Sequence, residues 1–187
     1  MIRANFTAEL HTQFGQVGVT DREGDWGPGA VGSAIEDGWL CVEGGLPGPN
    51  SLLGFLSLRF HFQYVKEEPS RIFYSITGTE RGAYAGSTLE KSKNGWLGMY
   101  GTHLVGRITH ALNPANLLDI SGRRLWKIET LQEWDGEIGS AESIECYLRD
   151  SLGHRVALVH SGKTYYFHAG NLDGEILKFR LRNIRLE

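Results

Sequence analysis

The stretch Leu177-Lys178-Phe179-Arg180-Leu181-Arg182-Asn183-Ile184-Arg185-Leu186 decides the fold of this chain, because apolar and polar side chains alternate along it. A period of two places one face of a strand against a core and the other face in water. The apolar residues share one parity as far as Leu181 and then move by one position, to Ile184. This shift predicts a β-bulge near Arg182 and Asn183.

A second alternating segment, residues 55–64, is the clearest strand of the chain. Its apolar face carries Leu56, Leu58, Phe60, Phe62 and Tyr64. The turn Glu67-Glu68-Pro69-Ser70 and the apolar run Ile72–Ile76 then predict a return strand, which makes a hairpin. Further strands are predicted at 39–42, 96–100, 125–134, 137–148, 155–160, 164–168 and 176–186. Residues 78–95 predict a loop interrupted by a short strand.

Only one segment has the pattern of a helix, and it is short. Asn113 can cap it, Pro114 suits its first position and Gly122 can end it, which predicts a helix near 114–119. One short helix among many strands predicts an all-β fold. We expect a single domain over 1–187, an antiparallel β-sandwich of the jelly-roll, concanavalin-like kind. A closed, lipocalin-like β-barrel is the alternative, because the last strands could form an up-and-down meander.

Composition narrows the class of protein. The chain has 187 residues, 41% of them apolar, which suits one sizeable core and argues against disorder. A net charge of −3 argues against nucleic-acid binding, and no apolar run approaches a membrane span. The segment Met1–Asn5 shows no apolar signal region, so a cytoplasmic protein is expected. Cys41 and Cys146 could form one disulfide, but buried free thiols are favoured in that compartment.

Three acids alternate in the segment Glu133-Trp134-Asp135-Gly136-Glu137. On a continuous strand they would share one face, and retaining glycosidases need two carboxyl groups about 5 Å apart. Glu133 and Glu137 are then catalytic candidates. Alternatively, Asp135-Gly136 forms a two-residue hairpin turn, which would place the two glutamates on opposite faces. The two interpretations exclude each other, and the alternation on both sides favours the hairpin.

The polar face of strand 55–64 is a further candidate region. His61 lies on it beside Arg59, where a ligand groove could form, and a merely solvated face is the alternative. His61 is therefore a third catalytic candidate and Arg59 a ligand-binding candidate.

Aromatic residues in turns are the remaining ligand-binding candidates. Trp26, Trp96 and Trp134 lie in or beside Gly-rich turns, where a large core residue is not expected. Exposed indoles stack on sugar rings and bury much area at low entropic cost. Tyr100, close to Trp96 in sequence, joins this group. Trp39 and Trp126 lie within strands and are assigned to the core.

No metal ligands are assigned. The seven histidines lack helix-based metal spacing, and no Cys-x-x-Cys occurs. The segment Asp21-Arg22-Glu23-Gly24-Asp25 has the acid spacing of a calcium loop, but Gly32 stands where the closing glutamate belongs. A solvated acidic turn is favoured, and calcium is the one cofactor left open.

Four segments of the chain are similar, in sequence and in order, to segments of a known family. They are Ile35–Val42, Phe55–Phe62, Ser70–Tyr74 and Phe179–Leu186. In these segments the chain resembles the concanavalin-like β-sandwich family that includes the 3-keto-disaccharide hydrolase domains. The resemblance covers mostly core strands and implies a β-sandwich that acts on carbohydrates. The family's Gly-Tyr-Glu-x-Gln segment corresponds to 82–86 here, which lacks the acid, so no catalytic residue is carried over.

Three functions follow from these observations. An enzyme that hydrolyses or eliminates a glycosidic bond predicts carboxylates and a histidine gathered in one cleft. A non-catalytic carbohydrate-binding module predicts aromatic residues without that cluster. A β-barrel that binds or cyclises a small hydrophobic molecule predicts an apolar interior cavity. The resemblance favours the first two functions. The expected partner is a carbohydrate or another small molecule, and neither a nucleic acid nor a membrane is expected to bind.

Overall fold

The computed structural model describes residues 2–20, 38–43, 55–68, 71–79, 84–100, 124–161 and 164–187. Three sequence predictions lie outside these ranges. They are the helix near 114–119, the acidic turn Asp21–Asp25 and the ligand-binding candidate Trp26.

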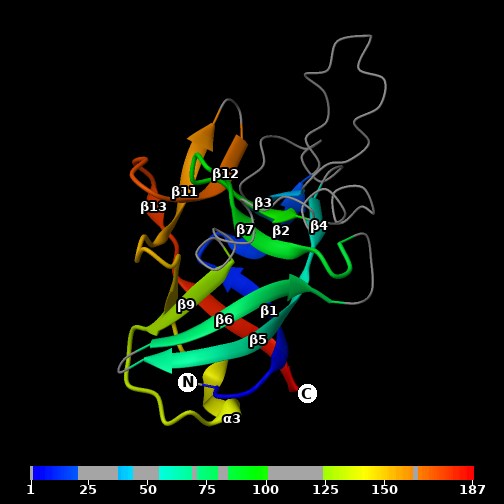
Figure 1. The fold of residues 1–187 in the computed structure, drawn as a ribbon, viewed down its shortest axis with the longest axis vertical. Coiled ribbons are helices and arrows are strands. Elements are labelled where there is room, and N and C mark those ends of the chain that lie inside the picture. Colours follow the sequence, from blue (N-terminus) through cyan, green and yellow to red (C-terminus); the bar gives the residue numbers. More distant parts are fainter. Residues whose placement is uncertain are drawn as a thin grey trace, which may run out of the picture.

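Apart from one short helix, the regular secondary structure of the described chain is β-strand (Figure 1). The strands of its first half are β1 (Phe6–Thr12), β2 (Gly15–Thr20), β3 (Gly38–Val42), β4 (Phe55–Ser57), β5 (Arg59–Glu68), β6 (Arg71–Gly78), β7 (Thr88–Lys91) and β8 (Leu97–Tyr100). The second half contributes β9 (Leu125–Thr130), the one-turn helix α3 (Ile138–Ala141), β10 (Cys146–Arg149), β11 (Val156–Ser161), β12 (Thr164–Ala169), β13 (Glu175–Ile176) and β14 (Phe179–Leu186).

The strands form one large sheet and one small sheet, and every pairing between named strands is antiparallel. The large sheet has the order β4-β2-β3-β8-β7-β6-β5-β1-β14-β10-β9, and the small one the order β12-β11-β13. Figure 1 shows β5, β6 and β9 crossing in front of β1 and β14, a two-layer, sandwich-like arrangement. The predicted all-β, antiparallel architecture is confirmed.

The edges of the two layers are also joined. β9 pairs with β6 as well as with β10, so the pairings β1–β14–β10–β9–β6–β5–β1 close a ring of strands. Closure removes free sheet edges, whose unpaired backbone groups would otherwise need partners. The layers are therefore held by backbone hydrogen bonds at their edges as well as by side-chain packing.

Aromatic side chains fill the space inside this ring. Phe6 and Phe62 stack with their ring centroids 4.6 Å apart, and Tyr74 meets both rings edge-on. All three are at most 1% exposed and belong to one hydrophobic cluster with Ile128 and Leu181. The interior is thus a packed core, unlike the ligand cavity that the lipocalin-like alternative predicted.

The predicted bulge in the last strand is present. Thr7 pairs with Arg185 and Glu9 with Arg182, so two residues of β14 lie opposite one residue of β1. Asn183 takes a φ of 53°, the only positive value among the described non-glycine residues. Asparagine tolerates this left-handed conformation better than most residues do, which explains why the parity changes at this position.

The region around Asp135-Gly136 is neither of the two structures predicted for it. β9 ends at Thr130, which pairs with Cys146, and α3 lies in the connection between β9 and β10. Gly136 has the positive φ expected of it, 90°, but Asp135 does not. Asp135 Oδ1 instead accepts hydrogen bonds from the Glu137 backbone N–H and the Ser140 hydroxyl, both at 2.9 Å. Such local bonds of an aspartate favour a turn before a helix over a strand.

Cys41 and Cys146 are both buried and both free, as favoured; burial raises the pKa of each thiol to about 12. Within the described ranges, no helix has the length and apolar character that spanning a membrane requires.

Candidate functional site

The hairpin formed by β11 and β12 presents two different faces. Val159 pairs with Tyr166, and His160 pairs with Tyr165. Because side chains alternate along a strand, Tyr166 and Tyr165 point to opposite sides of this hairpin. Each side borders a separate pocket.

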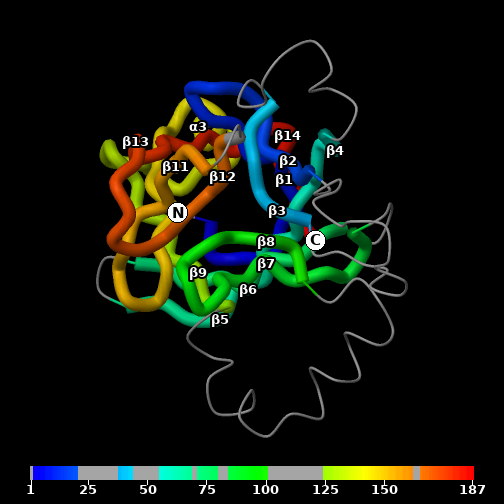
Figure 2. The backbone as a smooth tube through the Cα atoms, turned by 90° about the horizontal axis from the view of Figure 1, so that it is seen from above, coloured from blue at the N-terminus to red at the C-terminus, as the bar shows by residue number. Residues whose placement is uncertain are grey.

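The first of these, which we call the aromatic pocket, is open to solvent and measures about 320 Å³. It is lined by Trp39, Asn94, Trp96, Ser161 and Tyr166. Both Figures 1 and 2 show β12, which carries Tyr166, beside β3, which carries Trp39. The Tyr166 ring lies 6.4 Å from each indole, at 60° to Trp39 and 86° to Trp96. The three half-buried rings therefore form angled walls and not a flat platform.

The turn between β7 and β8 carries Asn94 and Trp96 into this pocket. Ser92 N–H donates to the Trp96 carbonyl at 2.8 Å, and the Ser92 hydroxyl accepts the Trp96 N–H at 3.0 Å. Gly95 has a φ of 90°, the left-handed conformation that closes a three-residue hairpin loop. A side chain is excluded there, because a Cβ on Gly95 would lie 2.3 Å from Nε2 of His168.

His168 on β12 contacts this turn through Asn94 and Trp96. Its Nε2 lies 2.9 Å from the Asn94 carbonyl oxygen, which can only accept, so the neutral ring carries its proton on Nε2. The Trp96 indole packs edge-on against the imidazole at 5.0 Å. Nδ1 is buried and has no hydrogen-bond partner in the described part of the chain. Burial lowers the pKa of His168 below its ordinary value, and nearby Lys91 and His154 lower it further, against the opposing effect of the Asn94 bond.

A buried ion pair fixes the same turn to the β10–β11 hairpin. Asp150, 2% exposed, is bonded to Nζ of Lys91 and accepts the His154 backbone N–H at 2.8 Å. Its carboxylate also lies 2.9 Å from Nδ1 of His154. Burial raises the pKa of Asp150, but the bonds from Lys91 and His154 outweigh burial and hold the pKa below its ordinary value. Lys91 therefore stays anchored one residue before the turn that carries Trp96.

Lowering the pH is expected to reduce the stability of the folded protein through His168, which packs against the turn of the aromatic pocket. In the unfolded chain His168 takes up a proton near pH 6.5. In the folded chain its pKa is lower, so the imidazole stays neutral down to a lower pH. This contribution to stability is therefore present above about pH 6.5 and is lost as pH falls toward the lowered pKa. Urea unfolding at pH 7 and pH 5 should show a larger loss for the wild type than for His168→Gln, which keeps a donor for Asn94 but does not titrate. An equal loss in both proteins would contradict this role, and His160→Gln, at an exposed histidine, is the matched control.

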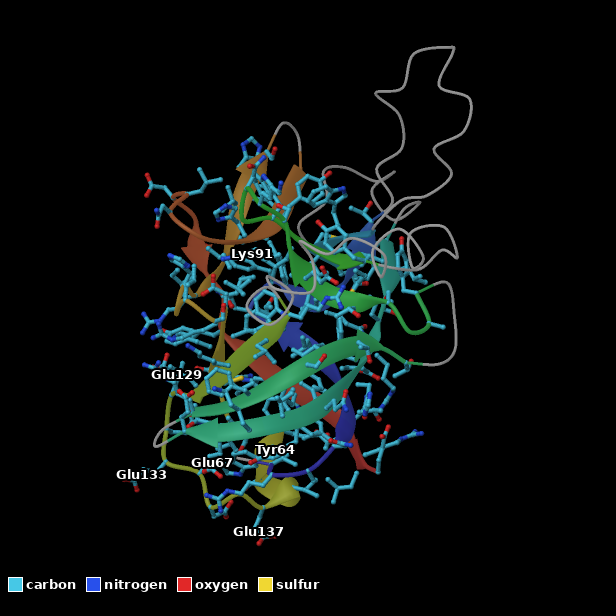
Figure 3. All side chains as sticks on the ribbon, viewed as in Figure 1. Tyr64, Glu67, Lys91, Glu129, Glu133 and Glu137 are labelled. Atoms are coloured by element: carbon cyan, nitrogen blue, oxygen red, sulfur yellow. The ribbon has the colours of Figure 1, made fainter. Side chains whose placement is uncertain are left out.

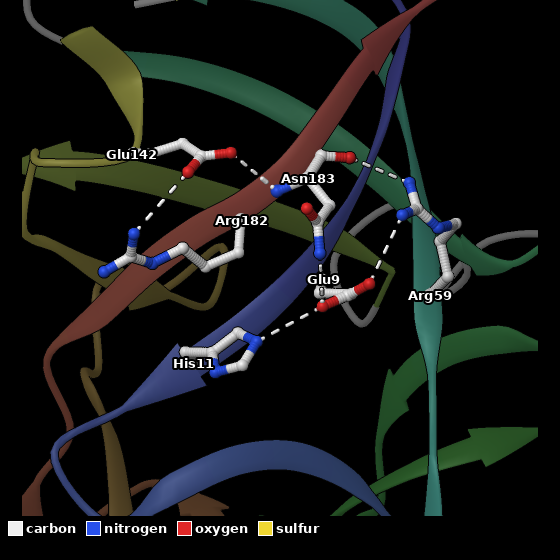
Figure 4. Close-up of polar contacts among 6 residues, drawn as sticks. All are labelled: Glu9, His11, Arg59, Glu142, Arg182 and Asn183. Atoms are coloured by element: carbon white, nitrogen blue, oxygen red, sulfur yellow. Dashed lines mark hydrogen bonds and ion pairs between the residues drawn. The ribbon is translucent and has the colours of Figure 1, made fainter.

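The ligand-binding candidate Arg59 belongs to a different cluster (Figure 4). Its guanidinium donates to the carbonyl of Asn183 at 2.8 Å and to Glu9 at 3.3 Å. Glu9 also accepts the Asn183 side-chain amide and lies 3.3 Å from Nε2 of His11. Burial raises the pKa of Glu9, but these donors outweigh it and lower the pKa overall. The cluster braces the bulge of β14 across β1 and β5, which accounts for the position of Arg59.

The catalytic candidates do not meet. His61 Nε2 lies 3.0 Å from the carboxylate of Glu187, at the end of the chain. Glu133 and Glu137 are exposed in the β9–β10 connection, and Figure 3 shows both pointing outward at the lower end of the molecule, whereas Lys91 lies in the upper half. The structure places neither glutamate beside His61 or the aromatic pocket.

The other aromatic candidates lie in different parts of the structure. Trp96 lines the aromatic pocket. Trp134 is partly packed on the core, and its indole donates to the Glu137 carbonyl and the Ser140 hydroxyl, at 3.1 and 2.8 Å. Tyr100 lies at the far end of β8, roughly 13 Å along the strand from Trp96. Tyr100 does not line that pocket within the described residues.

Sequence reasoning missed four of the five described residues that line the aromatic pocket. Trp126 is fully buried as predicted, but Trp39 is half-buried and faces Tyr166, so its assignment to the core was wrong. Tyr166 lies in a strand where both faces carry aromatic or histidine side chains, so periodicity could not show which face binds. Asn94 and Ser161 gave no signal in sequence beyond their place in turns.

No group of three or more histidine, cysteine or acidic side chains that could hold a metal ion occurs among the residues that the structure describes. Comparison with known proteins found no matching family model, no matching curated protein and no matching solved structure. The resemblance to the 3-keto-disaccharide hydrolase domains therefore rests on the sequence segments alone.

Proposed function

We propose that this protein binds a carbohydrate in the aromatic pocket. The observation that carries the proposal is the gathering of Trp39, Trp96 and Tyr166, all half-buried, around one open hollow. Large aromatic rings are normally buried in a core, and leaving three of them partly exposed around a concavity is typical of a binding site. The C–H faces of a sugar ring pack well on such rings.

The polar residues of the pocket suit a neutral, hydroxyl-rich ligand. Asn94 offers an amide donor and acceptor, and Ser161 offers a hydroxyl that can do either. Both residues are exposed, so their polar groups can reach a ligand. The described lining contains no charged side chain. A carbohydrate matches this set of groups better than an anion or a cation does.

The shape of the pocket favours a short ligand. About 320 Å³ is near the lower end of the volumes of small-molecule sites. The near-perpendicular rings of Trp96 and Tyr166 enclose a ligand on two sides, whereas a long polymer would need coplanar rings along a flat face. We therefore assign the pocket to a monosaccharide, a disaccharide or the end of a longer glycan.

Binding of a sugar by the Trp96→Ala variant is the decisive measurement. A thermal-shift screen of mono- and disaccharides should first identify a ligand. A ligand present at 100 times its Kd stabilises the folded state by about 2.7 kcal/mol. Calorimetry should then show binding to Trp96→Ala weakened by roughly 1–3 kcal/mol, because the stacking area is lost.

Tyr165→Ala is the matched control, because Tyr165 lies on the same hairpin but points to its other side. Its sugar affinity should equal that of the wild type. A large loss of stability in Trp96→Ala with unchanged affinity would instead make Trp96 a core residue and overturn the proposal. Release of a cleaved product during these titrations would show that the protein is an enzyme and not a binding module.

A further inference from the structure

The other side of the β11–β12 hairpin borders a second pocket, of about 450 Å³, which we call the acidic pocket. Its floor and walls come from Leu158 and His160 on β11, Tyr165 on β12 and Phe14 in the β1–β2 turn. Asp173 and Glu175, in and after the β12–β13 connection, complete the lining. None of the described residues lines both pockets, so the two can be tested separately.

The acidic pocket carries negative charge that the described chain leaves uncompensated. Several other carboxylates of the described chain are paired with a base, such as Glu129 with Arg149 and Glu145 with Arg180. Asp173 has no ion pair among the described residues. Within the described ranges, the one hydrogen bond to the Glu175 carboxylate comes from the neutral side-chain amide of Gln13, at 3.4 Å. No lysine or arginine is among the described lining residues.

Aromatic faces stand beside these carboxylates. Tyr165 is 42% exposed although it lies within a strand, and its ring centroid is 4.8 Å from that of His160, with the planes tilted by 51°. Phe14, which is half-buried, also lines the pocket. The faces of aromatic rings attract cations, and carboxylates beside them add charge and hydrogen-bond acceptors.

From this juxtaposition we infer that the acidic pocket binds an organic ammonium ion. The carboxylates of Asp173 and Glu175 supply the charge, and the ring of Tyr165 packs against the alkyl groups that carry it. A bare metal ion would require several oxygen or nitrogen ligands converging on one point, and no such group of three occurs within the described ranges. An open, partly aromatic hollow suits a larger, weakly hydrated cation.

Tetramethylammonium, compared with its neutral isostere tert-butanol, is the direct probe. Titration followed by NMR should give saturable shifts for the Tyr165 and His160 rings with the cation and none with the alcohol. Tyr165→Leu should weaken binding roughly 2- to 30-fold, the range of a cation–π contact, whereas Tyr165→Phe keeps the ring and should retain it. Glu175→Gln should also weaken binding, and added salt should reduce the effect of the carboxylates.

Two controls make the outcome unambiguous. Trp96→Ala, in the aromatic pocket, should bind tetramethylammonium as the wild type does, so this test does not depend on sugar binding. Equal melting temperatures of the Tyr165 variants would show that affinity, and not folding, has changed. Equal binding of the cation and the alcohol, or unchanged affinity in both Tyr165→Leu and Glu175→Gln, would overturn the inference.

Discussion

Phe62→Ala is expected to destabilise the folded protein by about 3–5 kcal/mol, because it empties the centre of the closed ring of strands. Phe62 is fully buried, stacks on Phe6 with the ring planes only 5° apart and meets Tyr74 edge-on at 5.9 Å. Strands held on both edges cannot collapse freely into the space left behind, so the cavity persists. For a chain of this size the melting temperature should fall by roughly 6–20 °C.

Urea unfolding followed by tryptophan fluorescence measures this change. Phe62→Leu fills more of the space and should lose clearly less stability than Phe62→Ala. Gln63→Ala, at the exposed neighbour on the same strand, should change stability by less than about 0.5 kcal/mol. A loss below about 1 kcal/mol for Phe62→Ala would mean that the ring does not enclose a packed core.

Gly95→Ala should have the second largest effect, on both stability and sugar binding. The residue needs a φ of 90°, and the added Cβ would lie 2.3 Å from Nε2 of His168. The left-handed backbone alone costs a non-glycine residue roughly 1–2 kcal/mol. The clash adds to this cost and pushes the turn away from β12, which displaces Asn94 and Trp96 from the aromatic pocket.

Gly153→Ala is a closely matched control. Gly153 occupies the same place in a three-residue hairpin loop, at a φ of 98°, but a Cβ there would meet nothing within 4 Å. Gly153→Ala should therefore show the backbone cost alone and leave sugar affinity unchanged. Shortening the clashing side chain, in Gly95→Ala with His168→Ala, should recover part of the stability measured in a double-mutant cycle. Equal losses for Gly95→Ala and Gly153→Ala would show that His168 does not confine the turn.

Predictions from local pattern succeeded where one segment supplies the whole signal. The alternation in β5 and β14 depends only on the period of a strand, and the bulge at Asn183 depends on one residue that accepts a positive φ. The place of Trp96 beside a glycine turn predicted a ring outside the core, and Trp96 is half-buried in the wall of a pocket. The prediction failed at Asp135-Gly136, where hydrogen bonds from Glu137 and Ser140 to Asp135 stabilise a different turn.

The sequence by itself determined the all-β class, most strand positions and two buried free thiols, because side-chain periodicity and backbone preference act over a few residues. Only the tertiary structure decided that β9 closes on β6 and that Trp39, Trp96 and Tyr166 share one pocket. Pairing between strands distant in sequence depends on the burial and hydrogen bonding of the whole core at once. No single segment carries this information, so the shared pocket could not be predicted from local sequence patterns.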